Sequence, residues 1–250
     1  LPKDYPVIIV AAGLSLEKNV HVLKRAKNKA LIIAVDTAVK YLISQNVYPD
    51  LIMTVDPNKD VRLFEDDRIR GLSLAIDSSV NYKVVENMSQ GKIIYATGNA
   101  AYYQTIYQLV GKNMYTLSGG GSVATYAFAL ALALDYTRLI MVGQDLAYTP
   151  GKMHAGNVDD FLEEAKTDRR TVRGYYGEDV STSPDYESYL RWYEMMLRIH
   201  KDIEVINATE GGAYIEGAVH MSLSEAVERY CKKEYDFEHA IKNMKPTFSV

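Results

Sequence analysis

Short, continuously apolar runs alternate with helical patterns along the chain, and this alternation is the strongest constraint on its fold. Continuous apolarity is typical of strands that are covered on both faces, as in a parallel sheet. We predict strands at Pro6–Ala12, Ala30–Val35, Asp50–Val55, Leu72–Ile76, Lys92–Ala96, Asn113–Leu117, Arg138–Gly143 and Ile203–Ala208. This pattern predicts an α/β fold, in which a doubly wound, mostly parallel sheet carries helices on both faces.

Helical patterns fill the segments between these runs. We predict helices at Leu16–Arg25, Thr37–Gln45 and Ser122–Leu134, the last buried because it is small and apolar all round. A further helix starts at Ser183-Pro184, a typical cap and first-turn pair. One face of it carries Tyr186, Tyr189, Leu190, Tyr193, Met196, Leu197 and His200. Such a stripe usually packs against its own sheet, and the alternative is a surface for a partner or a second subunit.

Composition and charge limit the partners of the chain. Its 250 residues are 48% hydrophobic and 24% charged, as in an ordinary globular protein. The net charge of −4 argues against nucleic acid, whose binding proteins carry a basic face. No apolar run reaches the roughly 18 residues of a spanning helix, so no membrane partner is expected. A single cysteine, Cys231, excludes an intramolecular disulfide and favours the cytoplasm.

Residues that follow the strands are the first candidates for a site, because ligands of doubly wound sheets bind beyond the carboxyl ends of the strands. Gly13 and Ser15 follow the first strand, where a tight turn and a helix start would attract a phosphate. The alternative is an ordinary capped turn. Asp36 and Asp56 follow the second and third strands and could bind Mg²⁺, a ribose or a base. Alternatively, each of them caps the next helix.

A glycine-rich loop precedes the most apolar helix. It consists of Ser118, Gly119, Gly120, Gly121 and Ser122. Glycines let the backbone approach a ligand closely and present several amide groups. The loop lacks the Gly-Lys-Ser/Thr of a Walker A motif. We interpret it as a ligand contact, and the alternative is tight packing of a helix on the sheet.

The densest polar stretch, Met141–Asn157, follows the seventh predicted strand. Gln144 and Asp145 lie at the expected ligand edge, and Tyr148 and Lys152 can contact anionic oxygens. The neutral imidazole of His154 could take a proton from an attacking hydroxyl. Our candidate catalytic residues are therefore His154, Tyr148 and Asp145, although a loop histidine can also be a plain surface residue. We expect the remaining histidines to be structural or solvated: His21, His200, His220 and His239.

A second polar set follows the last predicted strand. It contains Asn207, Thr209, Glu210, Gly211 and Gly212, which could close the site or only form a turn. No spacing of cysteine and histidine suggests a zinc site. No Gly-x-Ser-x-Gly elbow is present, which argues against an α/β-hydrolase.

Several motifs together resemble the central domain of the motility-associated factor (Maf) family of flagellin glycosyltransferases. The resemblance spans roughly Pro6 to Tyr230 and rests on "VIIVAAGLSLEKN", "AVDTAVKYLISQNVYPDLIMTVDP", "SGGGSVATYAFALALA", "LIMVGQDLAYTPGKMHAGN" and "INATEGGAYIEGA". It implies a Rossmann-like fold, similar to that of sialyltransferases. It also implies transfer of a nonulosonic acid, such as pseudaminic or legionaminic acid, from its CMP-activated form to Ser/Thr of flagellin, without a required cofactor.

The same resemblance assigns roles to residues. Gly13–Ser15, Asp36 and Ser118–Ser122 would hold the nucleotide, and the loop of His154 would face the acceptor. Leu14 departs from the proline of the family. Sialyltransferases have asparagine at the positions of Ala12 and Asp36.

The domain also resembles archaeal 6-hydroxymethylpterin diphosphokinase (MptE-like). "AVDTAVKYLISQNVYPDLIMTVDP" is similar to the aspartate pattern of that enzyme and of thiamin pyrophosphokinases. This resemblance implies that Asp36 and Asp56 bind Mg²⁺ and that a pyrophosphate moves from ATP to a pterin alcohol. A third hypothesis is a nucleotide-binding or flagellin-docking module without catalysis.

We expect a nucleotide-binding transferase domain over residues 1–225 and a helical tail over residues 226–250. Every functional hypothesis depends on one spatial prediction. Gly13, Asp36, Gly120 and His154 should gather at one edge of the sheet.

Overall fold

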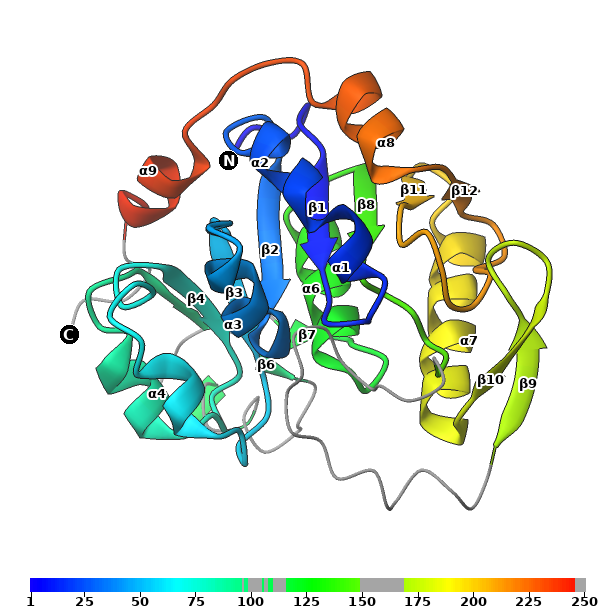
Figure 1. Cartoon of the computed structure of the whole chain (residues 1–250). Coiled ribbons are helices and arrows are strands. Elements are labelled where there is room, and N and C mark those ends of the chain that lie inside the picture. Colours follow the sequence, from blue (N-terminus) through cyan, green and yellow to red (C-terminus); the bar gives the residue numbers. More distant parts are fainter. Residues whose placement is uncertain (96, 99–104, 106–107, 110–115, 149–168, 246–250) are drawn as a thin grey trace.

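A parallel sheet of eight strands forms the centre of the molecule (Figure 1). The computed structural model describes residues 1–95, 97–98, 105, 108–109, 116–148 and 169–245. The strands follow the spatial order β12-β11-β8-β1-β2-β3-β4-β5. Their bounds are β1 (Val7–Val10), β2 (Leu31–Val35), β3 (Leu51–Thr54), β4 (Ser73–Ile76), β5 (Ile93–Tyr95), β8 (Arg138–Val142), β11 (Glu204–Asn207) and β12 (Val219–His220).

The strand order reverses beside β1. From β1 to β5 the chain adds strands on one side, and it then crosses to the other side of β1 to add β8, β11 and β12. Val10 pairs with Ala34 of β2 and with Val142 of β8, so these three strands end at the same level. The predicted doubly wound α/β fold is confirmed, and its switch point lies between β1 and β8.

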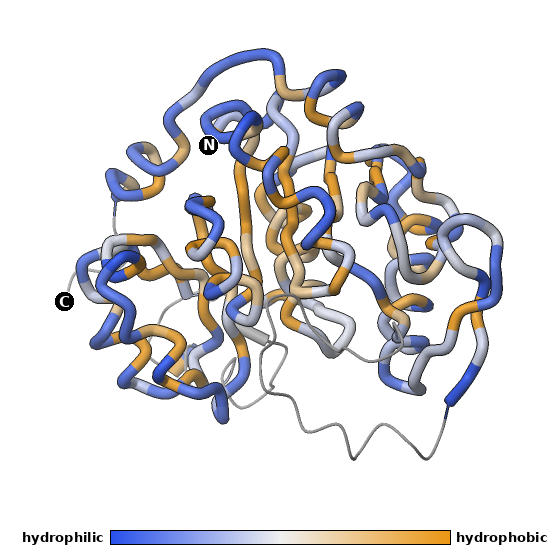
Figure 2. Tube along the Cα trace, viewed as in Figure 1, coloured by the Kyte–Doolittle hydropathy of each residue, from blue (hydrophilic) through white to orange (hydrophobic). Residues whose placement is uncertain are grey.

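Helices cover both faces of the sheet. One face carries α1 (Leu16–Asn19), the 3₁₀ helix η1 (Val20–Val22), α2 (Leu23–Ala26), α3 (Asp36–Ser44), the 3₁₀ helix η2 (Val61–Phe64), α4 (Tyr82–Asn87) and α8 (Leu223–Tyr230). The other face carries α6 (Val123–Ala133), α7 (Pro184–Ile199) and α9 (Phe237–Lys242). The apolar strands therefore lie in the interior, and the helices outside them are more polar, except for the apolar α6 (Figure 2).

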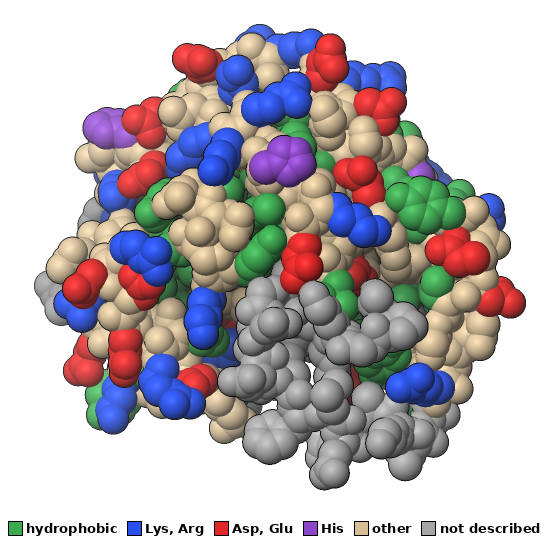
Figure 3. Space-filling view, viewed as in Figure 1, with side chains coloured by type: hydrophobic (Ala, Val, Ile, Leu, Met, Phe, Trp, Pro, Cys, Tyr) green, Lys and Arg blue, Asp and Glu red, His purple; other side chains and the backbone are tan. Residues whose placement is uncertain are grey.

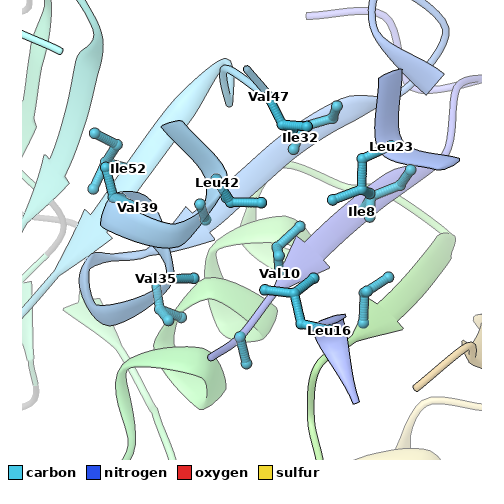
Figure 4. Close-up of a cluster of buried hydrophobic side chains, with 14 of the residues drawn as sticks. Ile8, Val10, Leu16, Leu23, Ile32, Val35, Val39, Leu42, Val47 and Ile52 are labelled. Carbon is cyan, nitrogen blue, oxygen red and sulfur yellow. The ribbon is translucent and has the colours of Figure 1, made fainter. Parts of the chain in front are cut away.

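A hydrophobic core lies on each face of the sheet, and alternate residues of β1 pack into the two cores. Ile8 and Val10 of β1 pack with Leu16 and Leu23 of the first helical layer (Figure 4), whereas Val7 and Ile9 belong to the second core. Successive side chains of a strand point to opposite faces. Covering both faces thus explains why the strand runs are continuously apolar.

Some predicted elements differ from the structure. The predicted helix at Leu16–Arg25 consists of three short segments, because Asn19 leaves helical geometry with φ −127°. The predicted strand at Asn113–Leu117 is described only as β7 (Thr116–Leu117), which pairs with β6 (Thr97–Gly98) outside the main sheet. The antiparallel hairpin of β9 (Arg170–Arg173) and β10 (Asp179–Thr182) was not predicted, because it is too polar to form an apolar run.

The predicted tail is part of the packed structure. Phe237 and Ile241 of α9 are fully buried against the sheet, and α8 starts at Leu223, before the expected boundary at residue 225. Cys231 is buried, and burial raises the pKa of its thiol to about 11.

Charges of both signs are interspersed on the face seen in Figure 3. Within the described ranges, no helix combines the length and apolarity needed to cross a membrane.

Candidate functional site

A pocket of about 160 Å³ opens at the switch point of the sheet, beyond the carboxyl ends of β1, β2 and β8. In Figure 1 this is the edge toward which the arrowheads of β1 and β2 point. The residues that line it are Ala11, Ala12, Gly13, Val35, Asp36, Thr37, Lys59, Ser122, Val123, Ala124, Gly143, Gln144, Asp145, Leu146, Ala147, Tyr186 and Tyr189. The structure thus brings together Gly13, Asp36, Ser122, Gln144 and Asp145 from the predicted set.

Asp145 connects the end of β8 to the turn after β1. Its Oδ2 accepts a hydrogen bond from the Ser15 amide at 3.1 Å, and its Oδ1 accepts one from the Ser15 hydroxyl. The Ser15 side chain makes no capping bond to α1, and its hydroxyl donates to Asp145 instead. Burial raises the pKa of the Asp145 carboxyl, although the bonds from Ser15 oppose this shift.

The backbone around Asp145 allows these close approaches. A Cβ on Gly13 would lie 2.3 Å from Asp145 Oδ1, and a Cβ on Gly212 would lie 2.1 Å from the Asp145 carbonyl oxygen. Leu146 has a φ of +51°, which is uncommon for a residue with a side chain. Its carbonyl accepts a hydrogen bond from the Thr182 hydroxyl at 2.7 Å. The strained residue is therefore held in place where it lines the pocket, as is frequent at functional sites.

Asp36 lies at the start of α3 and is held by three donors. Its Oδ1 accepts from the Thr37 amide at 2.7 Å and lies 3.0 Å from Lys59 Nζ. Its Oδ2 accepts from the Thr54 hydroxyl at 2.7 Å. The Asp36 side chain is fully buried, and that of Lys59 is 15% exposed. Lys59 was missed from the sequence, and the signal that could have found it is its place in the polar segment after β3.

The glycine-rich loop leads into the N-terminus of α6. Ser122 caps the helix by accepting from the Thr125 amide at 3.3 Å. A Cβ on Gly120 would lie 2.4 Å from the Trp192 ring, and Gly121 has a φ of +106°. Gly120 and Gly121 pack closely against rings of α7, and Gly119 packs against Tyr126 of α6, whereas Ser122 and the first turn of α6 line the pocket.

Aromatic side chains of α7 form one wall of the pocket. Tyr186 and Tyr189 line it, and the ring of Tyr148 lies 5.4 Å from that of Tyr186. The hydroxyl of the buried Tyr193 donates to Gln144 Oε1 at 3.4 Å. The tyrosine stripe of α7 therefore faces its own sheet and the pocket.

Other candidates lie away from the pocket. Asp56 is absent from its lining, and its Oδ1 accepts from the Asn58 amide at 2.8 Å. Glu210 Oε1 accepts from Asn19 Nδ2 at 3.0 Å and from the Leu223 amide at 2.9 Å, so this carboxylate joins three segments of the fold. The polar set after β11 thus supports the pocket from outside, with Gly212 beneath Asp145.

Histidines of the described ranges do not line the pocket. His220 stacks on Tyr214 at 4.1 Å, and burial lowers the pKa of its imidazole. His21 and His239 are exposed, and His200 ends α7. His154 and Lys152 lie outside the described residues.

The oxygen atoms of the pocket do not form a ligand set that suits a magnesium ion. Mg²⁺ needs near-octahedral oxygen ligands at about 2.0–2.1 Å. The oxygens of Asp36 already contact three donor groups, one of which is the ammonium of Lys59. Both oxygens of Asp145 accept hydrogen bonds from Ser15. No group of three or more His, Cys, Asp or Glu within the described residues is arranged for a metal.

Two comparisons relate the chain to known proteins. A family model described as 6-hydroxymethylpterin diphosphokinase MptE-like matches residues 1–151. The solved structure of the MAf glycosyltransferase from Magnetospirillum magneticum AMB-1 is similar in fold, with a TM-score of 0.74 and 21% sequence identity. The match covers 95% of this chain and 36% of that protein, so this chain spans little more than a third of its length. No curated protein matches the chain.

Proposed function

The chain belongs to the 6-hydroxymethylpterin diphosphokinase MptE-like family. We propose that it is a glycosyltransferase. The donor is a nonulosonic acid, a sialic-acid-like sugar, activated as its CMP derivative. The acceptor is a Ser or Thr hydroxyl of flagellin. The observation that carries the proposal is the position of the pocket, at the switch point between β1 and β8 and at the N-terminus of α6. Ligands of doubly wound sheets bind at such a point.

The first turn of α6 supports binding of the donor phosphate. Val123 and Ala124 line the pocket, and the first amides of a helix have no carbonyl partner within it. These amides and the positive end of the helix dipole attract an anion. Negative charge grows on the phosphate as CMP leaves, and donors that are fixed beforehand stabilise this charge.

Apolar and aromatic side chains support binding of the rings of the donor. Ala11, Ala12 and Val35 line the pocket together with Tyr186 and Tyr189. A tyrosine ring offers an apolar face for stacking and a hydroxyl for hydrogen bonding. This combination suits a nucleoside joined to a polar sugar.

We assign activation of the acceptor to the loop after β8. The acceptor oxygen bonds to the anomeric carbon of the sugar, and the bond from that carbon to the phosphate oxygen breaks. CMP leaves with the electron pair, and the hydroxyl proton passes to a base, for which we propose His154. Tyr148 donates to the leaving phosphate, and Asp145 fixes the start of the loop through Ser15.

The fold neighbour supports this choice of reaction, because it is described as a glycosyltransferase and shares the fold over 95% of this chain. We assign the reaction to the cytoplasm, whose reducing conditions suit a buried free thiol at Cys231.

A second candidate is the diphosphokinase, which the family description favours. It would move a diphosphate from ATP to a pterin alcohol, with Mg²⁺ bound by Asp36 and Asp56. The three donors already on Asp36 disfavour this reaction. A third candidate, a nucleotide-binding or flagellin-docking module, predicts binding of CMP without turnover.

Calorimetry with CMP and with ATP, each with and without Mg²⁺, separates the first two candidates. The proposal expects CMP to bind without metal. Incubation with a CMP-activated nonulosonic acid and flagellin should then raise the mass of flagellin by one sugar residue. Binding of ATP alone, and only with Mg²⁺, would favour the diphosphokinase.

A further inference from the structure

We propose that Lys59 binds the phosphate of the ligand in the position that a divalent cation would otherwise take. This inference rests on the proposed function and extends it, because it makes recognition of the phosphate independent of Mg²⁺. Asp36 is its positioning residue. It holds the ammonium of Lys59 at the pocket and does not itself contact the ligand.

Lys59 is the single lysine or arginine among the described residues that line the pocket. Its Nζ lies 3.0 Å from Oδ1 of the fully buried Asp36. Asp36 is fixed in turn by the Thr37 amide and the Thr54 hydroxyl, each at 2.7 Å. A cation is therefore anchored to the end of β2, beside the first turn of α6.

The chemistry of the ammonium suits this role. It carries three N–H donors, and the bond to Asp36 uses one of them. The remaining donors can point to phosphate oxygens while the pair to Asp36 stays intact. A magnesium ion would first have to displace Lys59 from Asp36, which would leave a lysine charge without its partner in a partly buried site.

A ligand class follows from this arrangement. One ammonium and a set of amides suit a phosphate that carries no metal, as in a nucleoside monophosphate or its sugar ester. A triphosphate chelated by Mg²⁺ would bring a second cation against Lys59. The pocket should therefore prefer CMP to Mg·ATP.

The test compares binding by calorimetry in the unchanged protein and in Lys59→Met, with CMP and with inorganic pyrophosphate as probes, in EDTA and in Mg²⁺. Charge-assisted hydrogen bonds contribute about 1.5–3 kcal/mol. We therefore expect Lys59→Met to weaken CMP binding by roughly ten- to a hundredfold. Lys59→Arg should retain part of the affinity. Lys40→Met, an exposed lysine of α3, is the matched control and should bind like the unchanged protein.

Lys59→Met leaves the buried Asp36 carboxylate without its ion-pair partner, which lowers stability. The double variant Asp36→Asn/Lys59→Met removes both charges, so its loss of binding reports the missing ammonium rather than a damaged fold. Thermal unfolding of each variant checks that the comparison is made on folded protein.

Equal CMP affinity in the folded double variant and the unchanged protein would overturn the role of Lys59 and leave the glycosyltransferase proposal standing. A strict Mg²⁺ requirement for CMP binding would also overturn it. If the unchanged protein binds pyrophosphate but not CMP, and the double variant loses that binding, the role of Lys59 holds and the CMP donor is wrong. If the unchanged protein binds neither CMP nor pyrophosphate, both the role of Lys59 and the CMP donor are contradicted.

Discussion

Ser15 and Asp145 lie 130 residues apart in the chain, yet they join the ends of two neighbouring strands at the centre of the sheet. The Ser15 amide donates to Asp145 Oδ2 at 3.1 Å, and its hydroxyl donates to Oδ1. The pair closes the turn after β1 onto the end of β8, and the pocket opens beside it. A buried carboxylate with two donors from one residue thus shapes the candidate site.

Asp145 should make stability depend on pH. Burial raises the pKa of its carboxyl in the folded chain, so ionisation of this group costs folding free energy. The cost is absent below the pKa of the unfolded chain, roughly 3.9, and is fully present above the raised folded pKa. The free energy of unfolding of Asp145→Asn, relative to that of the unchanged protein, should therefore increase as pH rises from 4 to 8.

Urea unfolding across this pH range measures the effect. Asp67→Asn is the control, since the Asp67 side chain is 84% exposed. A stability difference for Asp145→Asn that does not change with pH would contradict the explanation by burial.

Gly13→Ala should damage the site. The new Cβ would lie 2.3 Å from Asp145 Oδ1 and 2.4 Å from the Gly143 carbonyl oxygen, so the backbone has to shift. Overpacking of this kind costs about 1–3 kcal/mol, and we expect loss of CMP binding along with that loss of stability. Gly71→Ala meets no atom within 4 Å and serves as the control in unfolding and calorimetry. Unchanged binding in Gly13→Ala would remove Gly13 from the site.

Tyr186→Ala should weaken nucleotide binding because it removes part of the aromatic wall. Aromatic pairs contribute about 0.5–1.5 kcal/mol beyond burial, so the expected loss in CMP affinity is roughly two- to tenfold. Tyr82→Ala removes a tyrosine that is 66% exposed and distant in sequence, and it should have no effect. Equal losses in the two variants would argue against stacking at Tyr186.

His154→Ala should slow transfer of the sugar to flagellin by about a hundredfold or more while CMP still binds, because a general base acts in the chemical step. Single-turnover transfer assays, with His239→Ala in α9 as the control, measure this. Near-normal transfer by His154→Ala would refute the role.

The fold was predictable because a strand covered on both faces must be apolar at every position. Ile8 and Ile9 point into different cores, and the sequence shows this as an uninterrupted run. The ends of those strands also indicated Gly13, Asp36, Gln144 and Asp145, since parallel strands end at a common edge.

Contacts between distant segments were not predictable in the same way. Lys59 and Asp56 occupy the same polar segment after β3, and only the packing of that segment against Asp36 turns Lys59, rather than Asp56, to the pocket. The sequence also does not predict that Ser15 bonds to Asp145, because the Ser15 hydroxyl could equally have capped α1.

A crystal structure with bound CMP, grown without divalent metal, tests the central claim most directly. The account predicts the phosphate within hydrogen-bonding distance of Lys59 and of the first amides of α6, with the nucleotide beside Gly13 and Tyr186. CMP bound at another face of the sheet would contradict it, as would a phosphate that binds only through a metal ion bridging Asp36 and Asp56.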